Sequence, residues 1–333
     1  MNVENIRVSI GSAAVLGLYQ TDKFKVLPTT CYLMTYIKGH CTANCGFCPQ
    51  ARESKSSMEK LSRISWPIFP FKNFLTKLKY MPTKDRFKRI CIQTLNYPNN
   101  YEDLIEIVSK IRENVNIPIS VAIPPMPKEE LQNLKLVGVE KVGIALDAAN
   151  SNIFNKIKGK DVKGPYRWEE HFKALKEALE IFSLSNVTTH IILGLSESEK
   201  DVLSLIDQLY NLKINVSLFA FTPIKGTKLE NLCQPNLIYF RKLQLGRFLL
   251  LNGILKFQDL VFNSKDELVK YNINKKELWS IIENNNAFET SGCPGCNRPY
   301  YTSKPTGPFY NYPRKLKIDE KEEIYNQIMN YVN

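Results

Sequence analysis

Short apolar runs rich in β-branched residues alternate with longer amphipathic stretches along most of this chain. Strand patterns occur at residues 29–37, 89–95, 118–123, 139–146, 186–193 and 216–221. Helical patterns of apolar residues lie between them, at residues 66–80, 101–115, 128–137, 168–182 and 198–211. Such alternation predicts parallel β/α units with right-handed crossovers. We therefore expect an α/β protein built on a partial or full (β/α) TIM-type barrel.

The segments on either side of this pattern predict two appendages. Residues 1–28 carry apolar residues at helical spacing and predict an N-terminal helical cap. Residues 29–285 would form the barrel, with flanking helices at residues 237–284. Residues 286–333 are rich in Pro and Tyr and contain a Cys-x2-Cys pair. We expect them to form an irregular tail that packs over the barrel mouth and ends in a short helix.

Composition narrows the setting of this fold. The 333 residues include 45 Lys and Arg against 33 Asp and Glu, a net charge of +12 that suits an anionic cofactor, an acidic protein or nucleic acid. No run of about 18 apolar residues predicts a membrane span. The first residues also lack a basic region followed by an apolar run. We therefore expect a cytoplasmic protein that does not enter a membrane.

The cysteines carry the first sign of chemistry. Five of the eight lie in two tight motifs, which in a cytoplasmic chain favours metal ligation over disulfides. Cys41, Cys45 and Cys48 form a C-x3-C-x2-C motif directly after the first predicted strand of the barrel. Four-iron clusters are normally held by four thiolates, so three would leave one iron with an open position. The alternatives are a zinc site or three unrelated core cysteines.

Other candidate residues stand at the carboxyl ends of predicted strands, where β/α barrels carry their chemistry. They are Gln93, Thr94, Asp147, Gly194 and Thr222. The β/α alternation alone does not require polar or small residues at these positions. They therefore predict a functional site at the same end of the barrel as the cysteine loop.

The cysteine motif, with an aromatic residue before its third Cys, resembles that of the radical S-adenosylmethionine (SAM) superfamily. The chain is similar to biotin synthase over most of its length. The landmarks that match in order and spacing are residues 49–52, Leu146-Asp147, residues 192–197 and residues 222–229. The resemblance implies a [4Fe–4S] cluster whose open iron binds SAM. Reductive cleavage of SAM there yields a 5′-deoxyadenosyl radical.

The same resemblance implies roles for individual residues around SAM. Asp147 would contact the ribose hydroxyls, and the alternative for it is a helix N-cap. Phe47 would lie against the adenine, and Gly194 would let the backbone come close to SAM. Arg167 stands near the place where the family has an Arg by the SAM carboxylate. Among the histidines, His40 beside the cluster loop is the one candidate for the site, and a solvent-facing role is the reading that we favour for it.

The chain departs from biotin synthases at their second, two-iron cluster, which is held by three Cys and an Arg. Cys91 matches the first of these cysteines. Residues 120–122, 187–189 and 262–264 lack the other ligands. Because one ligand of four cannot hold that cluster, we do not expect this protein to be a biotin synthase.

The tail offers Cys293 and Cys296 instead, two neighbouring thiolates for one metal centre. We expect them to hold a second iron–sulfur cluster, with Cys91 or Cys233 as third ligand. A serine, Ser291 or Ser303, would be the fourth, as at the auxiliary cluster of lipoyl synthases. The alternatives are a zinc clasp and free thiols. Cys31, at the start of its strand, is expected in the core.

A radical generator beside a second cluster suggests sulfur insertion into unactivated C–H bonds. The family that fits best is the archaeal-type lipoyl synthase, a two-component system. The partners would then be an octanoylated lipoyl-carrier protein, a second radical SAM subunit and a reductant such as ferredoxin. A second hypothesis is a radical SAM mutase or maturase without sulfur insertion. A third is a basic, metal-stabilised nucleic-acid-binding protein, because aromatic and basic residues mix in the tail, but we do not expect nucleic acid.

Overall fold

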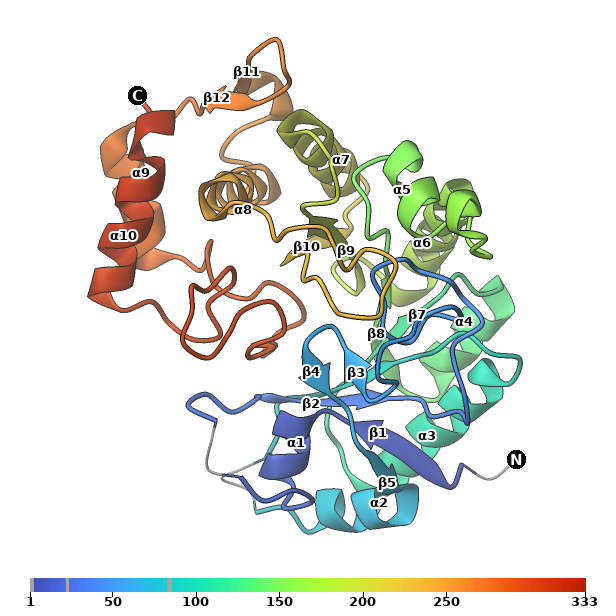
Figure 1. Cartoon of the computed structure of the whole chain (residues 1–333). Helices are drawn as coiled ribbons and strands as arrows, with labels where there is room; N and C mark the ends of the chain where they lie inside the picture. The colour runs from blue at the N-terminus through green and yellow to red at the C-terminus, as the bar shows by residue number, and fades with distance from the viewer. Residues whose placement is uncertain (1–2, 22–23, 83–85) are drawn as a thin grey trace.

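The central feature of the fold is a large, mostly parallel sheet (Figure 1). The computed structural model describes residues 3–21, 24–82 and 86–333. Among these residues, eight strands form the sheet in the order β10-β9-β8-β7-β6-β2-β1-β5. Its parallel strands are β2 (Thr30–Met34), β6 (Arg89–Gln93), β7 (Ile119–Ile123), β8 (Val139–Ile144), β9 (Val187–Leu193) and β10 (Asn215–Ala220). These are the predicted strands. The sheet stays open between β10 and β5, so the prediction of a partial barrel is confirmed.

Helices cover the outer face of this sheet (Figure 1). They are α2 (Phe71–Lys79), α3 (Asn100–Asn114), α4 (Lys128–Leu136), α6 (Trp168–Phe182) and α7 (Glu199–Asn211). The short α5 (Ser151–Ile157) follows β8. Strand β9 shows how the two faces divide, because its odd-numbered residues are buried while Thr188, His190 and Ile192 line a cavity. The outward face of the sheet thus makes the core with the helices, and the inward face carries the polar side chains.

The N-terminal segment corrects the prediction of a helical cap. Asn5–Val8 forms strand β1, which pairs antiparallel with β2 and with β5 (Ile68–Pro70). Among the described residues of this segment, the helix is limited to α1 (Ile10–Val15), and the Ser9 side chain caps its first turn. A short apolar run fits the periodicity of a strand as well as that of a helix. Here the hydrogen bonds to β2 and β5 make the segment a strand. Residues 1–2 and 22–23 of the predicted cap lie outside the described residues.

Two further boundaries differ from the prediction. The helix expected over residues 66–80 begins only at Phe71, since Pro70 precedes it as N-cap and residues 68–70 pair with β1. The helical region expected at 237–284 contains a hairpin. Its elements are α8 (Leu237–Leu251), β11 (Val261–Phe262), β12 (Leu268–Lys270) and α9 (Lys275–Asn284). Among the described helices, none combines the length and the apolar character that crossing a bilayer requires.

The sequence predicts that the tail packs over the barrel mouth, but in the structure the tail lies along the open side of the barrel. Asn297 Oδ1 accepts from the Thr29 amide at 3.0 Å, and the Pro294 carbonyl accepts from Arg89 Nε at 3.5 Å. Both partners stand at the amino ends of strands. Polar groups at these strand ends form hydrogen bonds with the tail, whose irregular backbone has few hydrogen-bond partners of its own. Further along, the Thr302 carbonyl accepts from Gln234 in the loop after β10, so the tail runs from the bottom of the barrel toward its mouth.

Two buried contacts hold the tail in this place. Arg241 on α8 is buried, and its guanidinium donates to the carbonyls of Phe309 and Tyr310. The hairpin of β3 (Lys60–Leu61) and β4 (Ile64–Ser65) supplies Ser62, whose hydroxyl donates to the Tyr301 carbonyl at 2.9 Å. The chain then ends in α10 (Ile318–Ile328) and a short 3-10 turn at Met329–Tyr331. Residues distant in sequence thereby line the interior of the same barrel.

Candidate active site

The loop that carries Cys41, Cys45 and Cys48 lies at the carboxyl end of the parallel sheet and is fixed from several sides. The Cys41 amide donates to the Gln50 carbonyl at 3.0 Å, which closes the loop on itself. The Gly46 amide donates to the Ile157 carbonyl at 2.7 Å and ties the loop to the end of α5. The three cysteines line the same cavity, of about 300 Å³. The structure therefore confirms the strand-end position that the sequence predicted for this loop.

The three thiols suit a metal cluster. They are free of disulfides. Burial raises the pKa of Cys48 to about 12, and it raises the pKa of Cys45 well above its usual value although Lys158 opposes this. Thiols in such surroundings become thiolates when a metal compensates the charge. Because the three sulfurs lie within one short loop, whereas the other thiols of the cavity lining, Cys91 and Cys293, come from β6 and the tail, the loop fits a [4Fe–4S] cluster with one iron left for SAM.

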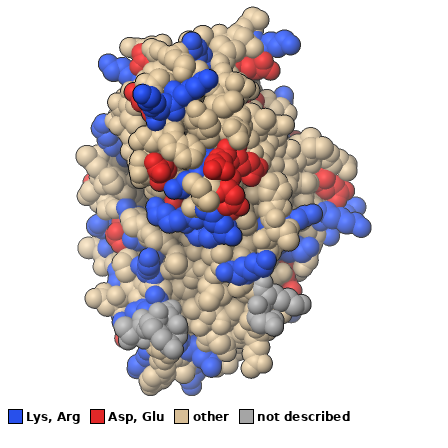
Figure 2. Space-filling view, turned by 90° about the vertical axis from the view of Figure 1, so that its left-hand side faces the viewer, with Lys and Arg blue, Asp and Glu red and all other residues tan. Residues whose placement is uncertain are grey.

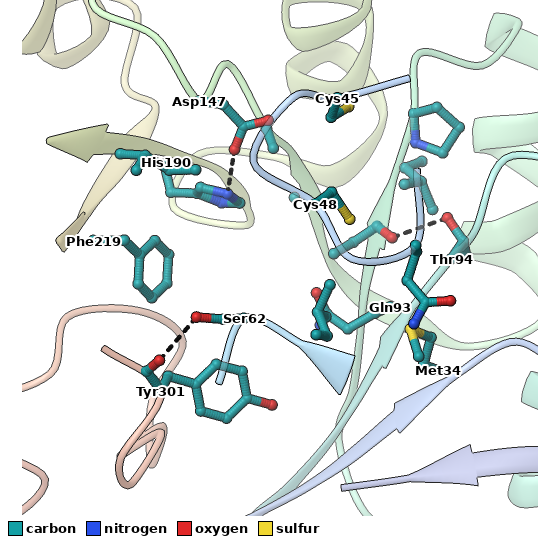
Figure 3. Close-up of a pocket in the computed structure, with 18 of the residues that line it drawn as sticks. Met34, Cys45, Cys48, Ser62, Gln93, Thr94, Asp147, His190, Phe219 and Tyr301 are labelled. Carbon is teal, nitrogen blue, oxygen red and sulfur yellow. Dashed lines mark hydrogen bonds and ion pairs between the residues drawn. The ribbon is translucent and has the colours of Figure 1, made fainter. Parts of the chain in front are cut away.

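Asp147 lies beside the cysteine loop, and its carboxylate points at His190 (Figure 3). Its Oδ2 accepts from Lys158 Nζ at 2.7 Å, and its Oδ1 pairs with His190 Nε2 at 2.8 Å. Burial alone would raise the pKa of Asp147, but Lys158 and His190 outweigh it and hold that pKa well below its usual range. Asp147 is therefore an anion with fixed geometry, and its contact with a ribose stays a prediction.

The other residues expected around SAM have different placements. Phe47 lines the cavity and packs with Ala148, Phe154 and Phe221 beyond the strand ends, a suitable position for an adenine. Gly194 has φ +100°, and a Cβ there would lie 2.9 Å from Pro235 Cδ, so the close approach that demands glycine is to Pro235. Arg167 is exposed and donates to the Gly164 and Tyr166 carbonyls, outside the cavity lining.

Lys158 and His190 are the residues that sequence analysis missed. His190 carried a usable signal, because it is an inward position of an alternating strand, whereas His40 is the one histidine candidate from the sequence. Lys158 carried none. It stands at the C-cap of α5, and only the return of this short helix brings its ammonium to Asp147 and the Ala145 carbonyl. The cation beside the cysteine loop is thus Lys158 and not Arg167.

A buried histidine behind this site makes stability depend on pH. His171 is packed against the Phe154 and Tyr166 rings, and burial followed by the charge of Lys158 lowers its pKa from 6.5 to about 3. The unfolded chain then binds one proton more than the native protein between these pH values. We expect the free energy of unfolding to fall by about 1.4 kcal/mol per pH unit below pH 6.5 from this residue alone.

Urea unfolding of the cluster-free protein at pH 7.0, 6.0 and 5.0 would measure this dependence, because the first value lies above 6.5 and the other two lie between 6.5 and about 3. His171→Phe keeps an aromatic ring in the pocket and removes the titrating group. Between pH 6.5 and 3, the free energy of unfolding of this variant should fall by about 1.4 kcal/mol less per pH unit than that of the wild type. Equal slopes in the two proteins would contradict the assignment.

A second set of cysteines meets inside the barrel. Cys91 comes from β6, and the turn that holds Cys293 and Cys296 is closed by a 2.9 Å hydrogen bond from the Cys296 amide to the Cys293 carbonyl. Burial raises the pKa of Cys91 to about 12, and the neighbouring Cys293 and Cys296 thiols act in the same direction. The structure therefore brings together the three cysteines that the sequence nominated as a group.

The remaining candidates for this second set lie elsewhere. Cys233 is exposed in the loop after β10, and Cys31 is fully buried in the core between sheet and helices. Ser291 and Ser303 do not line the cavity that holds Cys91 and Cys293, whereas Ser120 does. In the described ranges, no three His, Cys, Asp or Glu side chains converge closely enough to hold a single metal ion.

The same cavity connects the two sets of cysteines. Its lining includes the motif cysteines and Asp147 at the carboxyl ends of the strands, and Cys91 and Cys293 deeper in the barrel. Figure 3 shows His190 and Phe219 on one wall, with Cys48, Thr94 and Gln93 on the other. A molecule in this space would contact both cysteine sets.

Comparison with known proteins agrees with this architecture. The family model described as the radical SAM superfamily matches residues 35–209, more than half of the chain. Biotin synthase from Campylobacter hominis is 28% identical over 205 residues, 60% of this chain and 59% of the relative. Biotin synthase from Methanococcus vannielii is 24% identical over 214 residues, 60% and 58% of the two chains. The chain thus spans about three fifths of the length of these curated relatives.

Solved structures show the fold. Methylornithine synthase aligns with a TM-score of 0.50 at 16% identity, over 72% of this chain and 66% of that one. The FeFe-hydrogenase maturase HydG from Carboxydothermus hydrogenoformans aligns with a TM-score of 0.53 at 18% identity, over 67% and 51%. The segment that the family model matches, residues 35–209, contains the cysteine loop and strands β6 to β9. This chain belongs to the radical SAM superfamily.

Proposed function

We propose that this protein is a sulfur-inserting radical SAM enzyme whose substrate is an octanoyl chain on a lipoyl-carrier protein. One observation carries the proposal: the motif cysteines and the pair Cys91 and Cys293 line the same cavity. A substrate carbon held there is within reach of a radical source and of a second centre at once. The similarity to biotin synthases over 60% of the chain supports the same class of reaction.

The cavity walls suit an alkyl chain. Between the two cysteine sets the lining includes Val121, Ala122, Val142 and Ala145, which are small and apolar. When bound, the clusters and SAM supply the radical and the sulfur, and the protein supplies binding and exclusion of water. Asp147 and Lys158 neutralise each other at the strand ends, and the other two cations of the lining, Lys141 and Arg298, lie beside the second cysteine set. An uncharged chain matches this lining better than a charged metabolite.

The proposed partners follow from charge and from the chemistry. A net charge of +12 favours an acidic carrier domain. Figure 2 shows the face formed by α9, α10 and the tail, where Lys and Arg gather in several groups with acidic side chains among them. Reductive cleavage of SAM needs one electron, which we assign to a small reductant such as ferredoxin. A second radical SAM subunit would complete the system.

A single-turnover experiment tests the proposal. The protein is reconstituted with ³⁴S-labelled sulfide and incubated anaerobically with SAM, a reductant and an octanoylated carrier domain, with and without a second radical SAM subunit. We expect the carrier to gain ³⁴S, detected by mass spectrometry, while labile sulfide is lost from the protein. Formation of 5′-deoxyadenosine with no sulfur on the carrier under either condition would reject sulfur insertion and favour a mutase or maturase.

A further inference from the structure

Each sulfur of the second cysteine set contacts one polar side chain from the barrel. Gln93 Nε2 donates to Cys91 Sγ at 3.1 Å. Ser120 Oγ donates to Cys293 Sγ at 3.4 Å. Tyr32 Oη lies 3.3 Å from Cys296 Sγ. These three side chains come from β6, β7 and β2, which are neighbours in the sheet.

Both hydroxyl oxygens accept a further hydrogen bond, which leaves their protons free to be donated to sulfur. Ser120 Oγ accepts from Arg89 at 2.9 Å, and Tyr32 Oη accepts from the Arg298 amide at 2.9 Å. Each oxygen is therefore already an acceptor, and its proton is left for the cysteine. Once a cysteine is a metal-bound thiolate it can only accept, so Tyr32 is then the donor to Cys296.

The burial of the two hydroxyl-bearing side chains indicates that their contacts with sulfur are specific. Tyr32 is 1% exposed and Ser120 is 3% exposed, and both stand in strands that otherwise bury apolar side chains. A buried hydroxyl without a partner is costly, whereas Phe and Ala would satisfy the packing alone. The motif set differs. In the part of the chain that the structure describes, backbone amides of Asn96 and Ala43 donate to Cys41 and those of Gln50 and Ala51 to Cys48, but no side chain donates to the motif cysteines.

We propose that Tyr32, Gln93 and Ser120 are positioning residues for the second centre, which hold its three cysteine ligands and raise its reduction potential. The inference rests on the proposed function, since it needs a cluster on Cys91, Cys293 and Cys296. Hydrogen bonds to ligand sulfurs stabilise the reduced, more negative state of an iron–sulfur cluster. Arg89 and Arg298 add positive charge close to the same sulfurs.

A higher potential at this centre would serve sulfur transfer. When a carbon radical bonds to a sulfide, one carbon–sulfur bond forms and the sulfide becomes a thiolate. One electron then passes to iron, and one ferric ion becomes ferrous. The three donors stabilise the centre in the state that this step leaves behind.

Redox titration followed by EPR tests the inference on the reconstituted full-length protein. We expect Tyr32→Phe, Ser120→Ala and Gln93→Met each to keep both clusters and to shift the potential of the second centre to lower values. The potential of the motif cluster should not move. Ser120→Thr retains the hydroxyl and should restore the wild-type value, and Tyr80→Phe, whose ring is 74% exposed, is the matched tyrosine control.

The outcomes separate this inference from the proposed function. Two centres in every variant with unchanged potentials would overturn the positioning role and leave the second cluster in place. A wild type with the motif cluster alone would overturn both. If Tyr32→Phe loses the second centre, the Ser120→Ala and Gln93→Met potentials decide, and wild-type values in both would again overturn the inference.

Discussion

Replacing Cys293 and Cys296 together with alanine is expected to remove about four of about eight irons from the reconstituted protein, the sum for two four-iron clusters. Both thiols belong to the turn that meets Cys91 inside the barrel, and no substitute thiol lies there among the described residues. The motif cysteines lie in a separate loop at the other end of the cavity. We therefore expect SAM cleavage to persist while sulfur insertion is lost completely.

Iron and labile sulfide analysis with EPR measures the first effect, and 5′-deoxyadenosine formation with carrier mass measures the second. Cys233→Ala is the matched control, because Cys233 is exposed and should leave both counts unchanged. The reciprocal variant, Cys41→Ala, should abolish 5′-deoxyadenosine. Equal iron content in the double variant and the wild type would show that the tail pair binds no cluster.

The sheet could be predicted because its signal is local. Parallel strands buried on both faces appear as apolar, β-branched runs, and β2 and β6 to β10 appeared at the predicted places. Strand β1 could not be separated from a helix, since its four residues satisfy either period and only pairing with β2 and β5 decides. The cysteine loop was predicted for the same local reason, as its spacing is contained within eight residues.

Long-range contacts limit the prediction of the site. Strand register placed Asp147 correctly, but nothing near Lys158 indicates that α5 turns its C-cap toward that carboxylate. The sequence predicts that Cys91 joins Cys293 and Cys296 only because a cluster needs a third thiol ligand. In the structure the tail brings its two cysteines to Cys91 along the open side of the barrel. Ser120, which contacts Cys293, appeared in the sequence only as a missing cysteine. Residues on the inward face of a strand are therefore candidates for the site whether or not they match the pattern of a family.

Lys158→Met is expected to destabilise the protein by about 3–5 kcal/mol, the usual cost of removing one partner of a buried ion pair. Asp147 and Lys158 are each only 5% exposed. Without the ammonium, the carboxylate would keep only His190 as a partner in a site where burial disfavours its charge. The free energy of unfolding from urea titration at pH 7.5 measures this loss. Lys156→Met, on the exposed side of the same helix, is the matched control and should cost little.

The pH dependence distinguishes a lost ion pair from lost packing. In the wild type the pKa of Asp147 is depressed, so its stabilisation is complete above the unfolded value of 3.8 and is lost only as the pH falls below it. In Lys158→Met, burial should raise the pKa of Asp147 above the unfolded value. The native state then binds the additional proton, so the deficit relative to wild type shrinks as the pH falls from 7.5 toward 5, values chosen to lie above the unfolded carboxyl pKa.

The double variant Lys158→Met/Asp147→Leu removes both charges and should recover part of the loss at every pH. A deficit in Lys158→Met that stays constant with pH and is not relieved by the second substitution would mean that Lys158 acts through the packing of its stem against Phe154 and Tyr166.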